Sequence, residues 1–213
     1  MEIPRQQGHY YLQGPQILKR LFDIIASLLG LIILSPLILV ISIFVKTTSR
    51  GSIFYKGTRV GLYGKLFKIL KFRSMAENAD KIGGGITSYN DKRITKTGKW
   101  LRYYKLDEIP QLLNVLKGDM SIVGPRPEIQ FYVDKIPIKD RSIILSVKPG
   151  ISDWASLRGF HEDEKLKDSK DYEKDYLEKI LPKKIHFQVK YVKDRTFLKD
   201  IRIMFLTIYR IFK

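Results

Sequence analysis

The stretch IIASLLGLIILSPLILVISIFV, residues 24–45, decides how this chain is organised. It contains no charged residue, and at about 1.5 Å per helical residue it would extend about 33 Å, enough to reach across the hydrocarbon of a bilayer. The run begins too far into the chain for an ordinary signal peptide, and no small-residue cleavage site follows it. The sequence therefore predicts a membrane segment that the mature protein keeps.

Two features favour a helix that enters the membrane and returns over a helix that crosses it. Pro36 lacks an N–H group and should bend the helix, and the Ser35 hydroxyl can bond the backbone that the proline frees. Basic residues flank both ends of the run: Lys19 and Arg20 before it, and Lys46, Arg50, Lys56 and Arg59 after it. The positive-inside tendency would keep both flanks in the cytoplasm. By length alone, a straight single crossing is the alternative.

The composition indicates an acidic partner. The chain of 213 residues has 39 Lys and Arg against 22 Asp and Glu, a net charge of +17. Nucleic acid, anionic lipid head groups and phosphorylated substrates could each balance this excess. The sequence has no cysteine, which excludes disulfides, thiolate metal sites and a cysteine nucleophile. The length suits one domain.

Residues 52–75 have the pattern of a β-hairpin, because short apolar and β-branched runs alternate with Gly57, Gly61 and Gly64. The segment is strongly basic through Lys56, Arg59, Lys65, Lys68, Lys71 and Arg73. For most of these residues, a solvated face or attraction to anionic lipid is the better interpretation.

The segment 106–118 predicts a helix with a possible site at its start. Asp107 can cap it, Pro110 is tolerated in its first turn, and Gly118 closes it. A helix N-terminus binds phosphate and keeps a nearby carboxylate ionised, and an ionised carboxylate can attack phosphorus. The alternative is that Asp107 is only a cap and that Glu108 only occupies the first turn.

The loop that follows this helix supports the functional interpretation. Pro125 and Pro127 fix φ on both sides of Arg126, so the loop is stiff. The guanidinium of Arg126 could hold a phosphate through two hydrogen bonds. An acid, a cation and a membrane segment therefore occur together.

Residues 197–212 predict an amphipathic helix. Its apolar side carries Phe197, Ile201, Met204, Phe205, Ile208, Ile211 and Phe212. A core helix and a membrane-surface helix fit this pattern about equally well. The membrane segment elsewhere in the chain favours the surface.

From about Lys19 to its C-terminus, the chain resembles the bacterial sugar transferase family, the small monotopic phosphoglycosyl transferases. The resemblance is carried by Lys19–Asp23, the apolar run with Ser35-Pro36, Phe67–Met75, Leu106–Leu112, Asn114–Ser121, Gly124–Pro127 and Lys148–Gly150. Together and in this order, these stretches are highly specific.

The resemblance implies an α+β fold: a mostly helical membrane-associated domain with an N-terminal re-entrant helix broken at Ser35-Pro36, a small β-hairpin and amphipathic surface helices. Residues 1–18 would be a weakly ordered lead-in and residues 19–47 the re-entrant helix. Residues 48–213 would form the cytoplasmic catalytic region of the same single domain. The protein would lie at the cytoplasmic face of the bacterial inner membrane.

The resemblance also implies a two-step transfer that needs Mg²⁺. Asp107 would attack the sugar-bearing phosphate of a UDP-sugar, expel UMP and hold a phosphosugar ester. Undecaprenyl phosphate would then take the phosphosugar and so start the synthesis of a lipid-linked glycan. Splitting the displacement lets one carboxylate serve two bulky substrates in turn.

Further residues are matched to roles by the same resemblance. Asp107 would also contact the metal, and Glu108 would position either Asp107 or the metal. Lys71 and Arg102 would lie near the phosphates. The loop Pro125, Arg126 and Pro127 would receive the nucleotide. Asp200 is a candidate for a further family acid, with a surface position as its alternative.

The chain departs from the family in one region. Many members continue after Pro-Gly-Ile with Thr-Gly-Leu-Ala-Gln and then Asn-Gly-Arg. This chain instead has Ser152-Asp-Trp-Ala-Ser156 and Arg158-Gly-Phe160. The difference leaves the identity of the sugar open. The glycan pathway and any homo-oligomer also stay open.

Two other classes of protein compete with an enzyme. A nucleic-acid-binding protein would suit the charge of +17, but the sequence shows no recognisable binding fold and the apolar run does not fit this class. We therefore expect no nucleic-acid partner. A non-catalytic membrane adaptor would bind lipid through the basic hairpin and the C-terminal helix, and would not need Asp107.

Overall fold

The apolar run forms the first helix of a computed structural model, which describes residues 16–79, 91–158, 166, 169 and 171–211. Helix α1 spans Gln16–Thr48, a few residues more than the predicted 19–47. Of the predicted lead-in, residues 1–15 lie outside the described residues, and residues 16–18 belong to the helix.

The remaining elements alternate short helices with short strands. The N-terminal half contains β1 (Phe54–Val60), η3 (Leu62–Gly64), β2 (Leu66–Phe72), α3 (Lys96–Tyr103), η4 (Leu106–Glu108), α4 (Gln111–Lys117) and β3 (Ser121–Val123). The C-terminal half contains α5 (Gln130–Asp134), α6 (Ile138–Ile144), β4 (Gly150–Ser152), α7 (Trp154–Leu157), α9 (Tyr172–Asp175), η5 (Tyr176–Ile180), α10 (Leu181–Asp194) and α11 (Phe197–Ile211). The mixed helical and β composition confirms the predicted class.

Helix α1 has the length and exposure of a membrane segment. Among the described residues it is the one helix long and apolar enough to cross a bilayer, over Ile17–Thr48. Only 11% of its most apolar window is buried inside the structure. The core helix of a soluble protein would be mostly buried, so this exposure favours contact with lipid.

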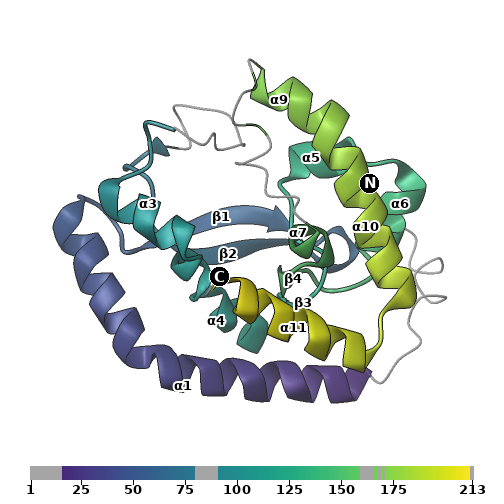
Figure 1. The fold of residues 1–213 in the computed structure, drawn as a ribbon, viewed down its shortest axis with the longest axis horizontal. Helices are drawn as coiled ribbons and strands as arrows, with labels where there is room; N and C mark the ends of the chain where they lie inside the picture. The colour runs from purple at the N-terminus through teal and green to yellow at the C-terminus, as the bar shows by residue number, and fades with distance from the viewer. Residues whose placement is uncertain (1–15, 80–90, 159–165, 167–168, 170, 212–213) are drawn as a thin grey trace.

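The predicted break in α1 is instead a bend. The helix is continuous through Ser35 and Pro36, and Figure 1 shows it curving between its two ends. Pro36 cannot bond the carbonyl of Ile32, the residue four positions earlier. The Ser35 Oγ donates a hydrogen bond to that carbonyl at 2.8 Å. The hydroxyl therefore replaces the missing N–H, and the helix bends without opening.

Polar side chains fix both ends of α1 to the rest of the domain. Arg20, in the first turns, donates to the carbonyls of Val115 and Leu116 at 2.6 and 2.9 Å. Arg73 donates to the carbonyl of Ser49, just beyond the last turn, at 2.7 Å. These bonds also satisfy carbonyls that the ends of α4 and α1 leave without helical partners.

Two small sheets position the loops. Strands β1 and β2 pair antiparallel from Phe54↔Phe72 to Val60↔Leu66, which confirms the predicted hairpin. Strands β3 and β4 pair in parallel, with Ser121 opposite Gly150. The carboxyl ends of β3 and β4 thus lie side by side where the Pro-Arg-Pro loop begins.

The core lies between these sheets and the C-terminal helices, and α11 belongs to both core and surface. Ile203 of α11 is fully buried with residues of β2, β3, α4 and α10. Other apolar side chains of α11 are exposed: Leu198, Phe205, Leu206, Ile208 and Tyr209. One face of this helix therefore belongs to the core, and the other is an exposed apolar face, for which contact with a membrane stays a prediction.

Candidate active site

The acidic pair lies in a short turn between two helices. The predicted helix 106–118 is in fact two elements, η4 and α4, and Pro110 rather than Asp107 occupies the cap position of α4. The expectation that Asp107 caps a helix is wrong, because the chain folds into a separate turn after Lys105, which has a left-handed φ of 55°. Gly118, at φ 93°, ends α4 as predicted.

This turn lies on the concave side of the bent membrane helix. Figure 1 shows α3 and α4 on the same side of α1, inside its curve. Leu106 and Ile109, which flank the acidic pair, belong to the cluster formed around Ile41 and Val45 of α1. The bend therefore places the two acids next to the exposed apolar helix α1.

The carboxylate of Glu108 forms ion pairs with two cations. Its Oε1 accepts from Lys71 Nζ at 2.8 Å and also pairs with Arg126 Nη2, while its Oε2 accepts from Arg126 Nη1 at 3.2 Å. Burial alone would raise the pKa of Glu108, but Arg126 and Lys71 outweigh it and hold that pKa well below its usual range. Glu108 thus joins the hairpin to the Pro-Arg-Pro loop as an ionised carboxylate.

Asp107 has the opposite environment. Its side chain is buried, with the residue 6% exposed, and no described residue donates a hydrogen bond to its carboxylate. Burial raises its pKa; Lys71 opposes that shift and the charge of Glu108 adds to it. Arg102 and Lys105 also act to lower the pKa. An unpaired carboxylate among cations is the arrangement that a nucleophile toward phosphate requires.

The two acids differ in their capacity to hold a metal. Within the described ranges, no group of three His, Cys, Asp or Glu side chains is arranged to bind one. Both carboxylate oxygens of Glu108 accept hydrogen bonds from Lys71 or Arg126, whereas no described residue donates one to the carboxylate of Asp107. Mg²⁺ usually takes one or two carboxylates and completes its shell with water and substrate phosphate. Asp107 fits this pattern as a single protein ligand.

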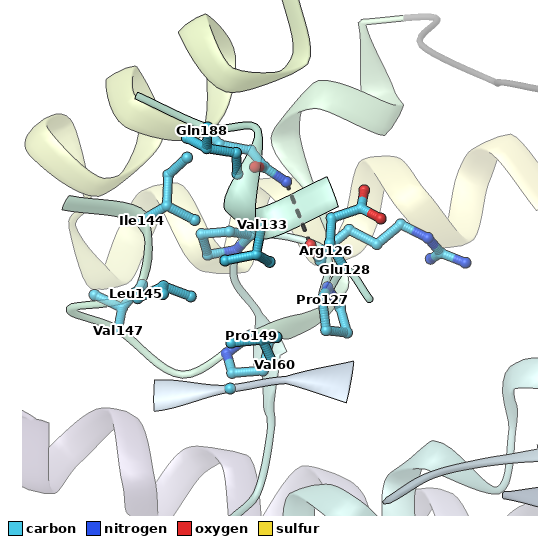
Figure 2. A pocket seen from close by; sticks show the side chains of 13 residues that line it. Val60, Arg126, Pro127, Glu128, Val133, Ile144, Leu145, Val147, Pro149 and Gln188 are labelled. Atoms are coloured by element: carbon cyan, nitrogen blue, oxygen red, sulfur yellow. Dashed lines mark hydrogen bonds between the residues drawn. The ribbon is translucent and has the colours of Figure 1, made fainter. Parts of the chain in front are cut away.

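The Pro-Arg-Pro loop is held by backbone and side-chain bonds. The Pro125 carbonyl accepts from Gly150 N at 2.9 Å, and the Arg126 carbonyl accepts from Gln188 Nε2 at 3.5 Å. Figure 2 shows a pocket beside the loop, lined largely by aliphatic groups such as Val60 and Leu145. The guanidinium of Arg126 points away from these groups, toward Glu108. The guanidinium of Arg126 and the carboxylate of Glu108 therefore lie outside the aliphatic part of this pocket.

The structure thus brings together five of the predicted site residues, namely Lys71, Arg102, Asp107, Glu108 and Arg126. Pro125 and Pro127 hold Arg126 in place from either side and line the neighbouring pocket. Asp200 lies in a different cluster. It pairs with Lys19 and accepts from the Tyr191 hydroxyl at 2.6 Å, so it ties the start of α1 to α10 and α11.

Sequence reasoning missed two features near the loop. Lys184 is buried and pairs with Glu128, which also accepts from the Tyr176 hydroxyl at 3.0 Å. The signal was the position of Lys184 on the buried stripe of α10, between Leu181 and Gln188, since a buried lysine needs an acidic partner. The second feature is Lys105, whose charge acts on Asp107 from two residues away.

Comparison with known proteins gives one family match and several similar proteins. The family model for bacterial sugar transferases matches residues 14–213. The UDP-glucose:undecaprenyl-phosphate glucose-1-phosphate transferase of Klebsiella pneumoniae is 41% identical over 198 residues, which cover 91% of this chain and 40% of that protein. The uncharacterized sugar transferase EpsL of Bacillus subtilis (strain 168) is 37% identical over 195 residues, covering 92% of this chain and 87% of that protein.

A third relative differs from the first in its sugar. The UDP-N-acetylgalactosamine-undecaprenyl-phosphate N-acetylgalactosaminephosphotransferase of Aeromonas hydrophila is 41% identical over 145 residues, 66% of this chain and 34% of that protein. The chain therefore spans well under half the length of the two relatives named for a sugar, and identity alone does not separate the two sugars.

Proposed function

This chain belongs to the bacterial sugar transferase family, and from that premise we propose that it transfers a sugar-1-phosphate from a UDP-sugar to undecaprenyl phosphate. The names of its relatives in Klebsiella and Aeromonas support both substrates. The observation that carries the proposal is the buried, unpaired carboxylate of Asp107, set among cations on the concave side of an apolar helix.

In the first step, a carboxylate oxygen of Asp107 attacks the phosphorus that bears the sugar. The bond from that phosphorus to the bridging oxygen breaks, and UMP leaves with the electron pair. A phosphosugar ester of Asp107 remains. Lys71, Arg102 and Arg126 stabilise the charge that develops on the phosphate oxygens.

In the second step, a phosphate oxygen of undecaprenyl phosphate attacks the same phosphorus. The bond between phosphorus and the Asp107 oxygen breaks, and the carboxylate is regenerated. The product is undecaprenyl diphosphate sugar. Because the carboxylate leaves as an anion, this step needs no proton when the acceptor is fully ionised.

Mg²⁺, held by Asp107 and the donor diphosphate, would neutralise the phosphate charge and stabilise the departing UMP. Glu108 has a different task in this proposal. Its ion pairs hold Lys71 and Arg126, from two separate parts of the chain, at the positions where the diphosphate binds.

We place the protein at the cytoplasmic face of the bacterial inner membrane, with α1 as a re-entrant helix. The bend at Ser35-Pro36 and the basic residues on both flanks support this topology. The acceptor phosphate lies at the membrane surface, and the concave side of α1 holds Asp107 close to that surface.

The test is UMP release by protein in nanodiscs with Mg²⁺, undecaprenyl phosphate and a panel of UDP-sugars. We expect release with at least one sugar, and a loss of at least about a thousandfold in Asp107→Asn, because the amide is not a nucleophile toward phosphorus. Asp200→Asn is the matched control, since Asp200 is equally buried but lies outside the site. Equal release by Asp107→Asn and the wild type would refute the proposal.

A further inference from the structure

The cations around Asp107 fall into two sets. Lys71 and Arg126 are engaged by Glu108. The side chains of Arg102, in the last turn of α3, and of Lys105, the residue after Tyr104, have no hydrogen-bond or ion-pair partner within the described part of the chain. Two substrates with phosphate groups must reach Asp107 in the proposed reaction. Arg102 already acts on the phosphate that is transferred, which leaves Lys105 for the phosphate of the second substrate.

The engaged pair belongs to the donor side. Lys71 comes from β2, and Arg126 comes from the loop at the carboxyl ends of β3 and β4. Ligands commonly bind at the carboxyl ends of parallel strands. Arg126 lies at such a position, and Glu108 joins Lys71 to it, so we assign both cations to the donor diphosphate.

The other two cations lie at the C-terminal end of α3, a helix that contacts the end of α1. Thr97 of α3 donates a hydrogen bond to Thr48, the last residue of α1, at 2.9 Å. Leu101 of α3 is fully buried in a cluster with Ile41 and Val45 of α1. Lys105 therefore follows, after Tyr104 alone, a helix that packs against the C-terminal arm of α1.

An aromatic group marks the membrane side of this helix. Trp100, Tyr103 and Tyr104 are exposed and contact one another edge to face, at ring-centroid distances of 4.8 Å (Tyr103–Tyr104) and 5.5 Å (Trp100–Tyr104). Indole and phenol rings favour the boundary between lipid and water, where one side of the ring is apolar and the other is wet. In the chain, Lys105 comes between these rings and Asp107.

The backbone of Lys105 supports a functional role. Its φ of 55° and ψ of 19° lie in the left-handed region, which costs a side chain with a Cβ roughly 1 kcal/mol. Glycine or asparagine would relieve this strain. Strained residues of this kind cluster at functional sites, and Lys105 lies two residues before the proposed nucleophile.

We propose that Lys105 binds the phosphate of the lipid acceptor and positions it for attack on the phosphosugar ester of Asp107. The ligand is a phosphate monoester at the bilayer surface, here undecaprenyl phosphate. The assignment rests on the proposed function, since it names the acceptor side of the same site. Lys105 is exposed, so an incoming lipid phosphate reaches its amine without any rearrangement of the core.

The experiment compares Lys105→Asn with the wild type in nanodiscs, in two assays. The first is the burst of UMP without acceptor, which reports the donor half-reaction. The second is the KM for undecaprenyl phosphate at saturating UDP-sugar. We expect an unchanged burst and donor KM, an acceptor KM raised about tenfold, and recovery in Lys105→Arg, because a charge-assisted hydrogen bond to phosphate is lost and then restored.

Two controls separate this role from its alternatives. Asn tolerates the left-handed backbone, so the variant should unfold at the wild-type temperature or slightly above it. Lys99→Asn, at an exposed position on α3, should leave both assays unchanged. Binding to phosphatidylcholine vesicles with and without phosphatidylglycerol distinguishes the acceptor from ordinary anionic lipid, and we expect Lys105→Asn to bind both like the wild type.

A normal burst with an unchanged acceptor KM in Lys105→Asn would overturn the assignment alone. Weaker binding to the anionic vesicles with an unchanged acceptor KM would assign Lys105 to lipid head groups and also overturn it. A wild type without any burst would overturn the proposed function and, with it, the role of Lys105.

Discussion

At the scale of residues, the two neighbouring acids have opposite electrostatic environments. Asp107 is buried without a hydrogen-bond donor in the described residues, and its pKa is raised. Glu108 is bound by Lys71 and Arg126, and its pKa is lowered. Adjacent carboxylates with pKa values pushed apart are typical of sites that divide chemical labour between them. Here one acid is left free to react while the other positions cations.

Glu108→Gln should destabilise the protein in a manner that depends on pH. The pKa of Glu108 is lower in the folded state than its usual 4.5, so its contribution is complete above that value and is lost as pH falls through the folded pKa. We expect a loss of roughly 2 kcal/mol at neutral pH, since charge-assisted bonds to two cations are weakened. The measurement is thermal unfolding of both proteins in detergent from pH 7 to pH 3.

The difference between the two proteins should shrink below about pH 4.5, the usual value for glutamate. Asp134→Asn serves as the control, because Asp134 is an exposed acid whose Arg141 contact spans 3.4 Å. A stability gap for Glu108→Gln that is constant across the whole range would contradict the role of the ionised carboxylate.

At the scale of elements, the bent helix α1 determines where the site lies. Pro36 removes one helical bond, Ser35 replaces it through the Ile32 carbonyl, and the resulting curve surrounds α3 and α4. A carbonyl without a partner is costly in lipid because no water is present to bond it. Ser35 and Pro36 therefore allow α1 to bend without leaving the Ile32 carbonyl unbonded. We expect this bend to keep the acidic turn near the membrane surface.

Replacing Ser35 and Pro36 together by alanine should straighten α1 and change its topology. We expect the wild type to expose single cysteines introduced at positions 10 and 50 on the cytoplasmic side alone, and the double variant to expose them on opposite sides in a substantial fraction of molecules. The chain has no native cysteine, so the labelling is clean. The readout is modification by an impermeant maleimide in inside-out and right-side-out vesicles.

Ser42→Ala is the matched control for this experiment. Its hydroxyl also bonds a helical carbonyl, that of Ile38 at 2.7 Å, but no proline has freed that carbonyl. The control should keep the wild-type labelling pattern. Opposite-side labelling of the wild type itself would show that the helix crosses the bilayer and would contradict the re-entrant topology.

The elements also show what could be predicted from sequence. The hairpin followed from local patterning, because glycines and β-branched runs specify it without reference to distant residues. The three-residue strands β3 and β4 are too short to show periodicity, and their pairing joins segments far apart in the chain. The helix expected over 106–118 was split because Lys105 adopts a left-handed conformation, which no propensity favours for lysine.

The residues of the candidate site could be predicted from the sequence, but the ion pairs between them could not. The motifs named Asp107, Glu108 and Arg126, and the structure brings them together. Glu108, rather than Asp107, forms the ion pairs with Lys71 and Arg126. This depends on which carboxylate faces the Pro-Arg-Pro loop, which the sequence alone does not show. The pairing of Lys184 with Glu128 likewise spans distant segments.

At the scale of the whole molecule, an apolar face and a net charge of +17 act together. Both α1 and α11 carry exposed apolar side chains, and the excess of cations attracts phosphate and anionic lipid. Electrostatic attraction is screened by salt, whereas burial of apolar surface in lipid is not. The two contributions are therefore separable by experiment.

We expect membrane association to survive about 1 M salt, at which the Debye length is about 3 Å. The measurement is sedimentation of membranes after salt and alkaline washes, with the protein detected in pellet and supernatant. Ile33→Lys, at a position 73% exposed on α1, should weaken retention in the alkaline wash because a charge enters the apolar face. Release of the wild type by salt alone would mean that charge, not the helix, anchors the protein.

The most direct test of the whole account is the mass of the protein after incubation with its UDP-sugar and Mg²⁺ in the absence of undecaprenyl phosphate. We predict an added mass of one sugar phosphate, located on Asp107 by peptide sequencing, absent from Asp107→Asn and discharged when undecaprenyl phosphate is added. An enzyme that forms the lipid-linked product while never carrying the adduct would contradict the account, because the acceptor would then attack the donor directly.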